Sequence, residues 1–385
     1  MPAATLPVPT PEAQAHSARL QQLIHREIAA QGGWIPFSRY MELVLYAPGL
    51  GYYTAGARKF GGEGDFVTAP EISALFGRTL ARQLAEIMAL STPQILELGA
   101  GSGKLAVDVL AELERLGALP ERYAILEVSA DLRERQQQRI ATALPHLADR
   151  VVWLDMLPDE ISGAVFGNEV LDALPVHLMR WTADGLRERG VVSAGETFSW
   201  QERLPENPSL VELAQALPMP DDYLSELSPA ARGLTASLCQ RLRQGVLLWV
   251  DYGFGAREYY HPQRDRGTLM CHYRHHAHDD PLFLPGLQDI TAHVDFTAVA
   301  EAGVDAGAEL LGYTSQAFFL LNCGITELLQ EAPPDDVKTY APLAGQLQKL
   351  TSPAEMGELF KVMTLGKGVD APLCGFALGE MSRML

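Results

Sequence analysis

Three glycines alternate with other residues in the segment Gly99-Ala100-Gly101-Ser102-Gly103, which follows an apolar run and precedes an amphipathic stretch. A glycine-rich turn between a strand and a helix lets a ligand lie against the backbone, and parallel sheets bind nucleotides at such turns. The dinucleotide fingerprint would need glycine at position 104, where Lys104 stands. The phosphate loop would need glycine at position 98 and Ser or Thr at position 105, where Leu98 and Leu105 stand. The segment therefore predicts a cofactor loop that fits neither motif.

Acidic residues follow the next two apolar runs. Glu127 lies 24 residues after Gly103, where a carboxylate can accept hydrogen bonds from both hydroxyls of a ribose. Asp155 follows the run 151–154 and could contact an adenine, although a solvated loop residue is an equally good interpretation. The loop and the two acids together favour a nucleoside-containing cofactor.

Short apolar runs alternate with amphipathic stretches from residue 94 onward. We expect strands at 94–98, 123–128, 151–154, 164–167 and 246–251, and helices at 104–116 and 129–144. Continuous apolar strands separated by helices are typical of a parallel sheet that is covered on both faces. Since crossovers between parallel strands are right-handed, the pattern predicts a doubly wound, Rossmann-like α/β fold.

Other segments surround this core. We expect helices at 17–30, from about residue 70 to 88, at 293–303 and at 315–330, and strands at 308–313 and 375–378. We also expect a β-hairpin or meander at 177–200, a mostly helical stretch at 205–243, and a long loop at 253–290 as a candidate active-site wall. This organisation predicts three parts. They are an N-terminal helical and loop region covering the cofactor site at 1–90, a catalytic core at 91–176 and 244–385, and an insertion at 177–243 that could cap the substrate or carry a homodimer interface.

Four further segments are more specific than the glycine loop. They are Leu45-Tyr46-x-Pro48-x-x-Gly51-Tyr52-Tyr53, Gly64–Ile72, Asn168–Pro175 and Gln288–Phe296. With them the chain resembles, from about residue 20 to its end, the MidA family of S-adenosylmethionine-dependent protein arginine methyltransferases. The glycine loop itself is similar to motif I of class I methyltransferases.

The resemblance implies S-adenosylmethionine as the cofactor, S-adenosylhomocysteine as the product, and a protein substrate with an exposed arginine. Because the family's mitochondrial member modifies a respiratory complex I subunit, it also implies a respiratory complex subunit as a candidate acceptor. We expect the residues around the loop and after the next two strands to bind the cofactor: Glu97, Gly99, Ala100, Gly101, Gly103, Glu127, Val128, Asp155 and Met156.

The segment Asn168-Glu169-x-x-Asp172 follows the fourth expected strand and carries the candidate catalytic residues. Methyl transfer is an in-line displacement in which the enzyme mainly orients the nucleophile. Carboxylates bond the guanidinium fork bidentately, so we interpret Glu169 and Asp172 as guanidinium clamp and proton acceptor, beside Asn168. One helical turn would place the two acids on the same face. The alternative is that they cap the next helix. Nucleic-acid amino-methyltransferases usually carry Pro-Pro-aromatic after the first residue, which this chain lacks.

Seven residues are candidates for the substrate channel: Asp65, Thr68, Pro70, Glu71, Asp251, Tyr252 and His293. The resemblance suggests that the first four lie over the cofactor or along the channel, although a capping box already explains Thr68 and Glu71. The pair Asp251-Tyr252 ends the fifth strand and could equally form a turn. His293 could reach the pocket, while residues 289–291 could instead cap the following helix.

The composition limits the partners and the location. The formal charge is −18, which disfavours a nucleic-acid surface, and an apolar content of 47% excludes wholesale disorder. The four cysteines are too far apart for a local zinc or redox motif, and no apolar run is long enough to span a membrane. We therefore expect a soluble, cytoplasmic protein. His272, His275, His276 and His278 have spacings that could hold zinc or nickel, but the resemblance implies no metal, and we predict none.

The leading hypothesis is thus a protein arginine methyltransferase. A small-molecule methyltransferase and a cofactor-binding assembly chaperone without turnover remain as alternatives. A dehydrogenase is the fourth hypothesis, and Lys104 argues against it.

Overall fold

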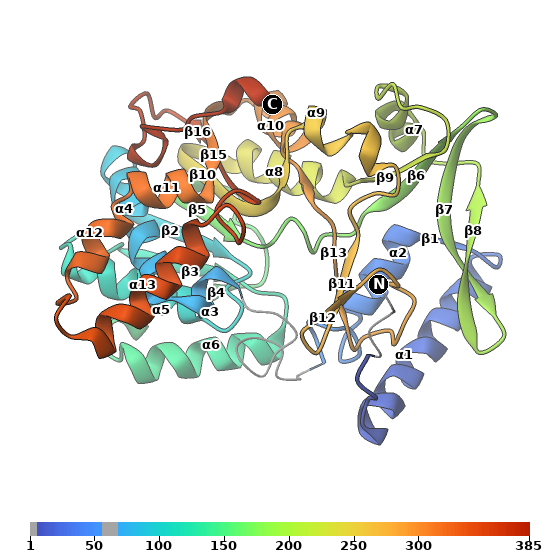
Figure 1. Cartoon of the computed structure of the whole chain (residues 1–385), viewed down its shortest axis with the longest axis horizontal. Helices are drawn as coiled ribbons and strands as arrows, with labels where there is room; N and C mark the ends of the chain where they lie inside the picture. Colours follow the sequence, from blue (N-terminus) through green and yellow to red (C-terminus); the bar gives the residue numbers. More distant parts are fainter. Residues whose placement is uncertain (1–5, 56–67) are drawn as a thin grey trace. The chain divides into compact units, whose positions relative to one another are not determined.

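The computed structural model describes residues 6–55 and 68–385 (Figure 1). The described residues form two compact units, of which the first comprises residues 6–55, 172–231 and 258–293. The second comprises residues 68–171, 232–257 and 294–385. The boundaries of these two units differ from those of the expected three parts. For example, α4 (Ala74–Leu90) belongs to the second unit, whereas we expected it in the N-terminal region. The roles given to those three parts remain predictions.

One sheet organises the second unit, with strand order β15-β16-β10-β5-β2-β3-β4 and β14 paired with β10. The strands β4, β3, β2, β5 and β10 run parallel, which confirms the predicted doubly wound sheet. β16 is antiparallel to both of its neighbours, β10 and β15. The strands are β2 (Gln94–Leu98), β3 (Arg122–Leu126), β4 (Val151–Leu154), β5 (Ile161–Asn168), β10 (Leu242–Phe254), β14 (Val294–Asp295), β15 (Glu309–Ser315) and β16 (Phe360–Lys367).

The expected strand at 375–378 is wrong. The late strand is β16, and residues Cys374–Phe376 form a short 3₁₀ helix, η3. The apolar run is buried by helix packing instead of by strand pairing, because Phe376 packs against Phe319 of α11 and the Gly375 N–H donates to the Gln83 side chain of α4. The strands β2, β3, β4, β5, β10 and β15 lie within a few residues of their expected positions, whereas β14 was not expected.

Helices of the second unit cover the sheet. Apolar residues of α4, α5, α6, α11, α12 and α13 form one core with Ile95, Phe166 and Leu248 of the strands. Side chains fix where helices begin: Ser73 accepts a hydrogen bond from Leu75 N at the start of α4. The helices are α3 (Ala69–Ile72), α4, α5 (Lys104–Arg115), α6 (Ala130–Ala143), η1 (Ala148–Arg150), α10 (Phe296–Asp305), α11 (Gln316–Asn322), α12 (Ile325–Gln330), α13 (Val337–Thr351), η3 and η4 (Ser382–Met384). Both α8 (Pro229–Arg241) and α9 (Ala256–Tyr259) cross the division between the units.

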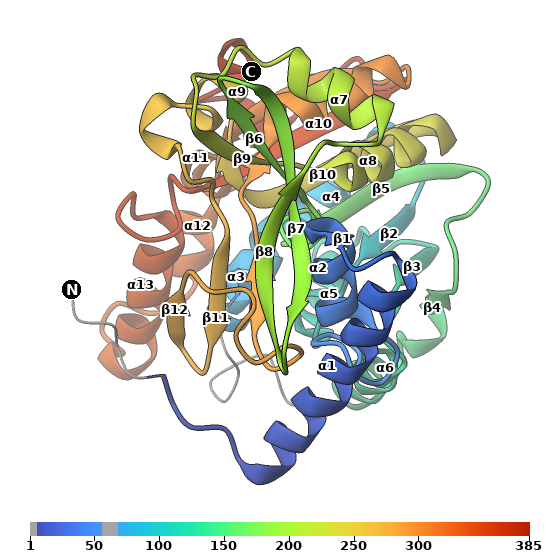
Figure 2. The same cartoon turned by 90° about the vertical axis from the view of Figure 1, so that its right-hand side faces the viewer.

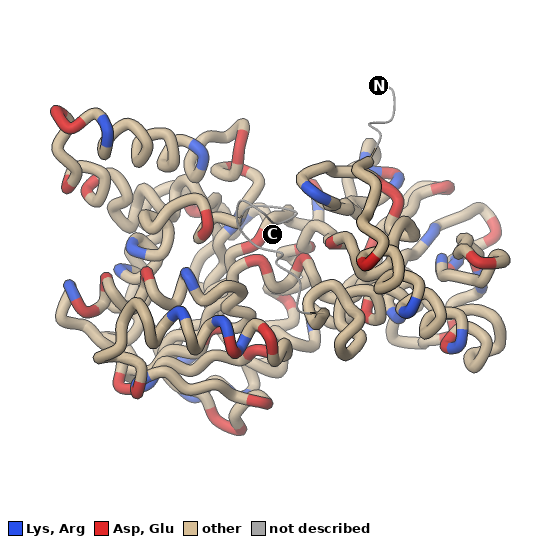
Figure 3. Tube along the Cα trace, turned by 90° about the horizontal axis from the view of Figure 1, so that it is seen from below, with Lys and Arg blue, Asp and Glu red and all other residues tan. Residues whose placement is uncertain are grey.

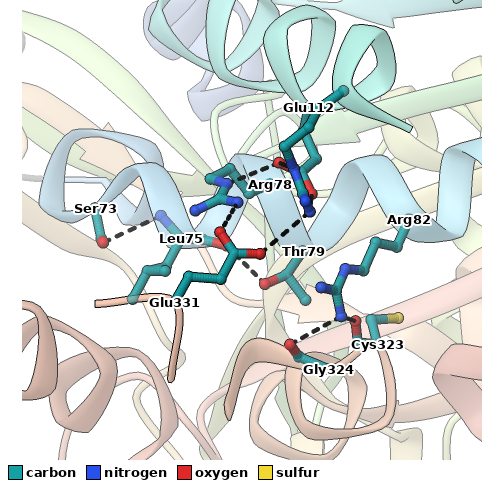
Figure 4. Close-up of polar contacts among 10 residues, drawn as sticks. Ser73, Leu75, Arg78, Thr79, Arg82, Glu112, Cys323, Gly324 and Glu331 are labelled. Atoms are coloured by element: carbon teal, nitrogen blue, oxygen red, sulfur yellow. Dashed lines mark hydrogen bonds and ion pairs between the residues drawn. The ribbon is translucent and has the colours of Figure 1, made fainter. Parts of the chain in front are cut away.

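An ion-pair network ties three of these helices together (Figure 4). Glu112 of α5 is buried and binds Arg78 of α4 at 2.8 Å and Arg115 at 2.5 Å. Glu331, which follows α12, pairs with both arginines. Although burial opposes ionisation, the two guanidinium groups lower the pKa of Glu112. This network holds α4 and α5, the helices on either side of the glycine loop in sequence.

The first unit contains two small sheets (Figure 2). One has the order β1-β7-β6-β9, with β8 paired with β7, and helices α1 and α2 contact β7. The other has the order β12-β11-β13. The elements are α1 (Pro11–Ala30), β1 (Ile35–Pro36), α2 (Phe37–Tyr46), β6 (His177–Thr182), β7 (Gly185–Ala194), β8 (Thr197–Arg203), α7 (Pro208–Gln215), β9 (Tyr223–Leu227), η2 (Pro262–Arg264), β11 (Met270–Tyr273), β12 (His276–His278) and β13 (Asp289–Thr291).

Strands β6, β7 and β8 form an antiparallel meander, one of the two forms expected at 177–200. The stretch 205–243 is only partly helical, because β9 adds to the sheet between α7 and α8. The expected loop at 253–290 is wrong, since this segment contains α9, η2 and three strands.

Figure 3 shows acidic and basic residues interspersed along the chain trace.

Candidate active site

The carboxyl ends of four neighbouring strands stand in register. Leu98 of β2 pairs with Leu126 of β3 and with Gly167 of β5, and Leu126 pairs with Leu154 of β4. Parallel strands that end in register place their next residues along one edge of the sheet, where doubly wound folds bind ligands. Four predicted site residues follow these ends: Gly99, Glu127, Asp155 and Asn168.

The glycine loop requires its glycines. Gly99, Gly101 and Gly103 have φ angles of 63°, 52° and 77°, which residues with a side chain rarely adopt. Gly103 is the residue directly before α5, and Gly99 N donates a hydrogen bond to Leu126 O at 3.0 Å. A Cβ at Gly101 would meet no heavy atom of the described residues within 4 Å. The backbone of the loop therefore borders open space at Gly101.

Glu127 is buried and held by two donors. Its Oε1 accepts a hydrogen bond from Ser129 N, and its Oε2 accepts one from the side-chain amide of Gln136, both at 2.9 Å. Burial raises the pKa of Glu127, and these hydrogen bonds oppose the rise. The carboxylate is thus fixed at the end of β3, in the position where we predicted a ribose acceptor.

Gln136 was not predicted as a site residue. It is fully buried in α6, its Nε2 also donates to Gly101 O at 2.9 Å, and its Oε1 accepts from Trp153 Nε1 at 2.9 Å. It thereby joins the glycine loop to Glu127. A signal existed in the sequence, because Gln136 stands at the middle of the apolar stripe formed by Leu132 and Ile140 at four-residue spacing.

The residues after β3 and β4 are exposed. Val128 and Met156 each have an exposed fraction of 76%, which is high for large apolar side chains. Asp155 is exposed as well, and its Oδ1 pairs with Arg133 Nη1 at 2.8 Å. Arg133 also donates to Leu154 O and to Glu127 O, so it ties the ends of β3 and β4 together.

Glu97 lies inside the sheet rather than at its edge. Its side chain is buried in β2, and its Oε2 accepts a hydrogen bond from the hydroxyl of Tyr123 at 2.7 Å. Burial raises the pKa of Glu97 to about 8, and the nearby Glu127 adds to the rise. Glu97 is therefore mostly protonated at neutral pH.

The capping box expected at Thr68 and Glu71 is wrong. Thr68 makes no side-chain cap at α3, and Glu71 instead accepts a hydrogen bond from the Ser102 hydroxyl of the glycine loop. Ser73 caps α4, since the backbone extends there and separates α3 from α4. The described part of the N-terminal motif thus contacts the glycine loop. Pro70 is buried in α3, and Asp65 lies outside the described residues.

The helical turn expected after β5 does not form. Glu169 has φ 53°, a left-handed conformation that is uncommon for a residue with a side chain. Its N–H donates to Val250 O at 2.8 Å, and its Oε1 accepts from Asn168 Nδ2 at 3.0 Å. The buried Asn168 Oδ1 accepts no hydrogen bond from the described residues. Asp172 is buried in the first unit, where its backbone oxygen accepts from Ala292 N.

Asp251 fixes the backbone after β5. Its Oδ2 accepts hydrogen bonds from Val170 N at 3.1 Å and Leu171 N at 2.8 Å, and its Oδ1 accepts from Tyr252 N. Asp251 is almost completely buried, so its carboxylate is committed to this turn. The Tyr252 ring packs edge-on against Phe360, with 5.3 Å between ring centroids.

His293 belongs to the first unit, where its N–H donates to Thr268 Oγ1 at 3.1 Å. Residues 289–291 form β13 and do not cap a helix, because Asp295 caps α10. The four histidines at 272–278 lie in a hairpin in which Arg274 and His275 form the turn between β11 and β12. The described residues contain no group of three or more His, Cys, Asp or Glu side chains placed to hold a metal.

The fold and the edge residues define a class of protein. The sheet is parallel apart from one antiparallel strand, β16, and it carries a glycine turn after β2 and an acid after β3. This combination is typical of class I, S-adenosylmethionine-dependent methyltransferases. A family model described as S-adenosyl-L-methionine-dependent methyltransferase matches residues 79–314. The chain belongs to this family, the MidA family, and S-adenosylmethionine is its cofactor.

Two crystal structures of proteins from Burkholderia thailandensis are similar over 99% of this chain and 100% of their own. One, bound to S-adenosyl-homocysteine, is 50% identical with a TM-score of 0.96, and the other, a native structure, is 49% identical with a TM-score of 0.94. Among curated proteins, the mitochondrial "Protein arginine methyltransferase NDUFAF7" of Homo sapiens is 31% identical and is covered over 80% of its length by 86% of this chain. The Drosophila melanogaster homolog is 30% identical over 96% of this chain and 91% of its own length.

These relatives correct one expectation. We expected a cytoplasmic protein, but the curated relatives are named as mitochondrial, which contradicts that location. Widely spaced cysteines do not distinguish between these compartments, so the sequence argument was too weak. Within residues 6–55 and 68–385, no helix combines the length and apolar character that a membrane span requires.

Proposed function

We propose that this methyltransferase transfers a methyl group to an arginine side chain of a protein. The proposal draws on the relatives named protein arginine methyltransferases, at 30–32% identity. The observation that carries it is the turn at Asn168-Glu169, where a carboxylate on left-handed backbone follows the strand end at the ligand-binding edge. Left-handed backbone at a non-glycine residue costs free energy and often marks a functional site.

The cofactor fits the second unit. The bound cofactor supplies an electrophilic methyl group on a positively charged sulfur. Gly101 offers backbone beside open space, Glu127 offers a fixed carboxylate for the ribose, and Val128 and Met156 offer exposed apolar side chains for an adenine. We assign cofactor contacts to these residues and, with them, to Gly99, Ala100, Gly103 and Asp155; Glu97 acts from inside the sheet.

Glu169 is the proposed catalytic residue. A carboxylate can bond two guanidinium N–H groups, orient the attacking nitrogen and accept the proton that leaves it. The hydrogen bond from Asn168 Nδ2 to Glu169 Oε1 orients this carboxylate, and Asn168 Oδ1 is an acceptor suited to a further N–H group. Asp251 acts as a positioning residue, because it holds the backbone of Val170 and Leu171.

Several finer assignments remain predictions. The pairing of Glu169 with Asp172 is one, since the two residues belong to different units. The channel roles of Thr68, Pro70, Tyr252 and His293 are others. We keep a respiratory complex subunit as the predicted acceptor and the homodimer as a predicted assembly. We do not expect the protein to bind nucleic acid.

The test is transfer of labelled methyl groups from S-adenosylmethionine to proteins of an undermethylated bacterial lysate, followed by acid hydrolysis and amino-acid analysis. We expect labelled methylarginine with the unaltered chain and at least a hundredfold less with Glu169→Gln, which should still bind S-adenosylhomocysteine. The matched control is Glu160→Gln, at an exposed glutamate paired with Arg243. Label confined to small molecules would instead indicate a small-molecule methyltransferase. Binding without any transfer would indicate an assembly factor without turnover.

A further inference from the structure

Two cysteines that are 51 residues apart in sequence lie side by side in the second unit. Cys323 directly follows α11 and Cys374 begins η3, and their sulfur atoms are 3.9 Å apart. Both are free thiols; Cys323 is buried and Cys374 is partly exposed. A disulfide requires about 2.05 Å between the sulfurs, so the two thiols lie within about 2 Å of bonding distance.

Residues of α4 hold both cysteine segments in place. Arg82 donates to the carbonyl oxygens of Cys323 and Gly324, at 3.2 and 3.0 Å (Figure 4). Glu86 Oε2 accepts from Cys374 N at 2.9 Å, and Gln83 Oε1 accepts from Gly375 N at 2.8 Å. One helix thus anchors the backbone on either side of the pair, which gives the two thiols a high effective concentration.

A second set of contacts joins the two segments directly. The side-chain amide of Asn322 donates to Gly375 O at 2.9 Å and to Leu378 O at 2.8 Å. The rings of Phe319 and Phe376 also pack with 5.9 Å between their centroids. The segment that carries Cys374 is therefore already docked on the end of α11, next to Cys323.

We propose that Cys323 and Cys374 form a reversible disulfide when the protein meets a peroxide, and that this bond stabilises the second unit. Cys374, as the thiolate, attacks hydrogen peroxide, gains one oxygen as a sulfenic acid and releases hydroxide. Cys323 then attacks that sulfur, the S–S bond forms and the oxygen leaves as water. In total, two thiols and one peroxide give one disulfide and two waters.

The order of the two steps follows from the surroundings of each thiol. The hydrogen bond with Cys374 and burial raise the pKa of the Cys323 thiol, and Glu86 adds to the rise. Cys374 is the more exposed of the two, so peroxide reaches it first. The pair closes a loop of 51 residues, and a disulfide across a long loop stabilises mainly by restricting the unfolded chain.

The experiment treats the reduced full chain with one equivalent of hydrogen peroxide, blocks the remaining thiols with iodoacetamide, and maps peptides by mass spectrometry without reduction. We expect a peptide pair joined through Cys323 and Cys374 that has lost two hydrogen atoms and separates after dithiothreitol treatment. The melting temperature should rise by a few degrees and return on reduction.

Matched variants separate this pair from other thiols. Cys323→Ser and Cys374→Ser should each abolish both the linked peptide and the rise in melting temperature. Cys239→Ser removes a buried cysteine of α8 and should leave both unchanged. The proposal is wrong if Cys374 is oxidised to the sulfinic acid with Cys323 still alkylatable, or if the only disulfide joins two chains.

Discussion

Gln136 donates a hydrogen bond from its side-chain amide to the carboxylate of Glu127, with 2.9 Å between Nε2 and Oε2. The same amide group reaches the carbonyl of Gly101, also at 2.9 Å. One buried side chain of α6 therefore sets the position of the proposed ribose acceptor relative to the glycine loop. Both contacts lie within the second unit.

Replacing Gln136 should weaken cofactor binding indirectly, because Gln136 positions Glu127 and Gly101 and does not itself contact the cofactor in the proposed site. In Gln136→Leu, Glu127 and Gly101 lose a donor, and an unsatisfied buried acceptor costs about 1–3 kcal/mol. We expect the affinity for S-adenosylhomocysteine, measured by calorimetry, to fall by about tenfold or more. Gln137→Leu, at the exposed neighbour, is the matched control. Equal affinity in both variants would show that Gln136 does not position the site.

Gly101→Ala should separate cofactor binding from folding. The substitution costs about 1–2 kcal/mol because φ is 52°, and the new Cβ would occupy the open space beside the loop. Gly195→Ala is a close control, since Gly195 has φ 65° and open space as well but lies in the turn between β7 and β8. Both variants should lose similar unfolding free energy in urea. Only Gly101→Ala should lose affinity for S-adenosylhomocysteine, and an unchanged affinity would place the cofactor elsewhere.

Local features of the sequence predicted much of this architecture. The parallel strands, the glycine loop and the acid at Glu127 depend on apolar runs and on spacings within a few dozen residues. The positive φ angles at Gly99, Gly101 and Gly103 then confirm why glycine is needed there.

The missed features depend on contacts between residues far apart in sequence. Glu71 satisfies the capping pattern locally, yet it bonds Ser102, which lies 31 residues away. Asp251 accepts a hydrogen bond from the backbone of Leu171, which lies 80 residues away in sequence. The turn that this contact stabilises replaces the helical turn expected at Glu169. No periodicity reports such contacts, because they arise only once the strands are ordered in the sheet.

Asp251→Asn should reduce catalysis more than cofactor binding. An amide has one acceptor oxygen where the carboxylate has two, so either the N–H groups of Val170 and Leu171 or that of Tyr252 would face an NH₂ group instead of an acceptor, and the backbone beside Glu169 would shift. Misplacement of a catalytic group by about 1 Å costs roughly a hundredfold in rate. We expect the methyl-transfer rate to fall by 10- to 100-fold, with S-adenosylhomocysteine affinity retained. Asp149→Asn, at an exposed residue of η1, is the control, and an unaltered rate in Asp251→Asn would refute the positioning role.

Glu97 should make the protein less stable as the pH rises. Its pKa is about 8 in the folded chain against 4.5 for an ordinary glutamate, so the folded state keeps a proton that the unfolded state releases. The resulting loss of stability begins near pH 4.5 and is complete above pH 8. Since each pKa unit corresponds to about 1.4 kcal/mol, it amounts to at most about 5 kcal/mol.

Glu97→Gln removes this titration while Tyr123 can still donate to the side-chain oxygen. The unfolding free energy of the variant, relative to the unaltered chain, should therefore increase between pH 4.5 and pH 8 in urea titrations. Glu121→Gln, at an exposed residue just before β3, controls for the loss of one charge. A difference that does not change with pH would show that Glu97 is ionised in the folded protein.

The most direct measurement is a calorimetric titration of the purified chain with S-adenosylhomocysteine, repeated with NAD and with the Glu127→Ala variant. If the glycine loop and Glu127 form the cofactor site, S-adenosylhomocysteine binds with saturation, NAD does not bind, and the variant loses at least tenfold in affinity while remaining folded. Equal binding by the variant, or no binding by the folded unaltered chain, would contradict the site described for this edge of the sheet.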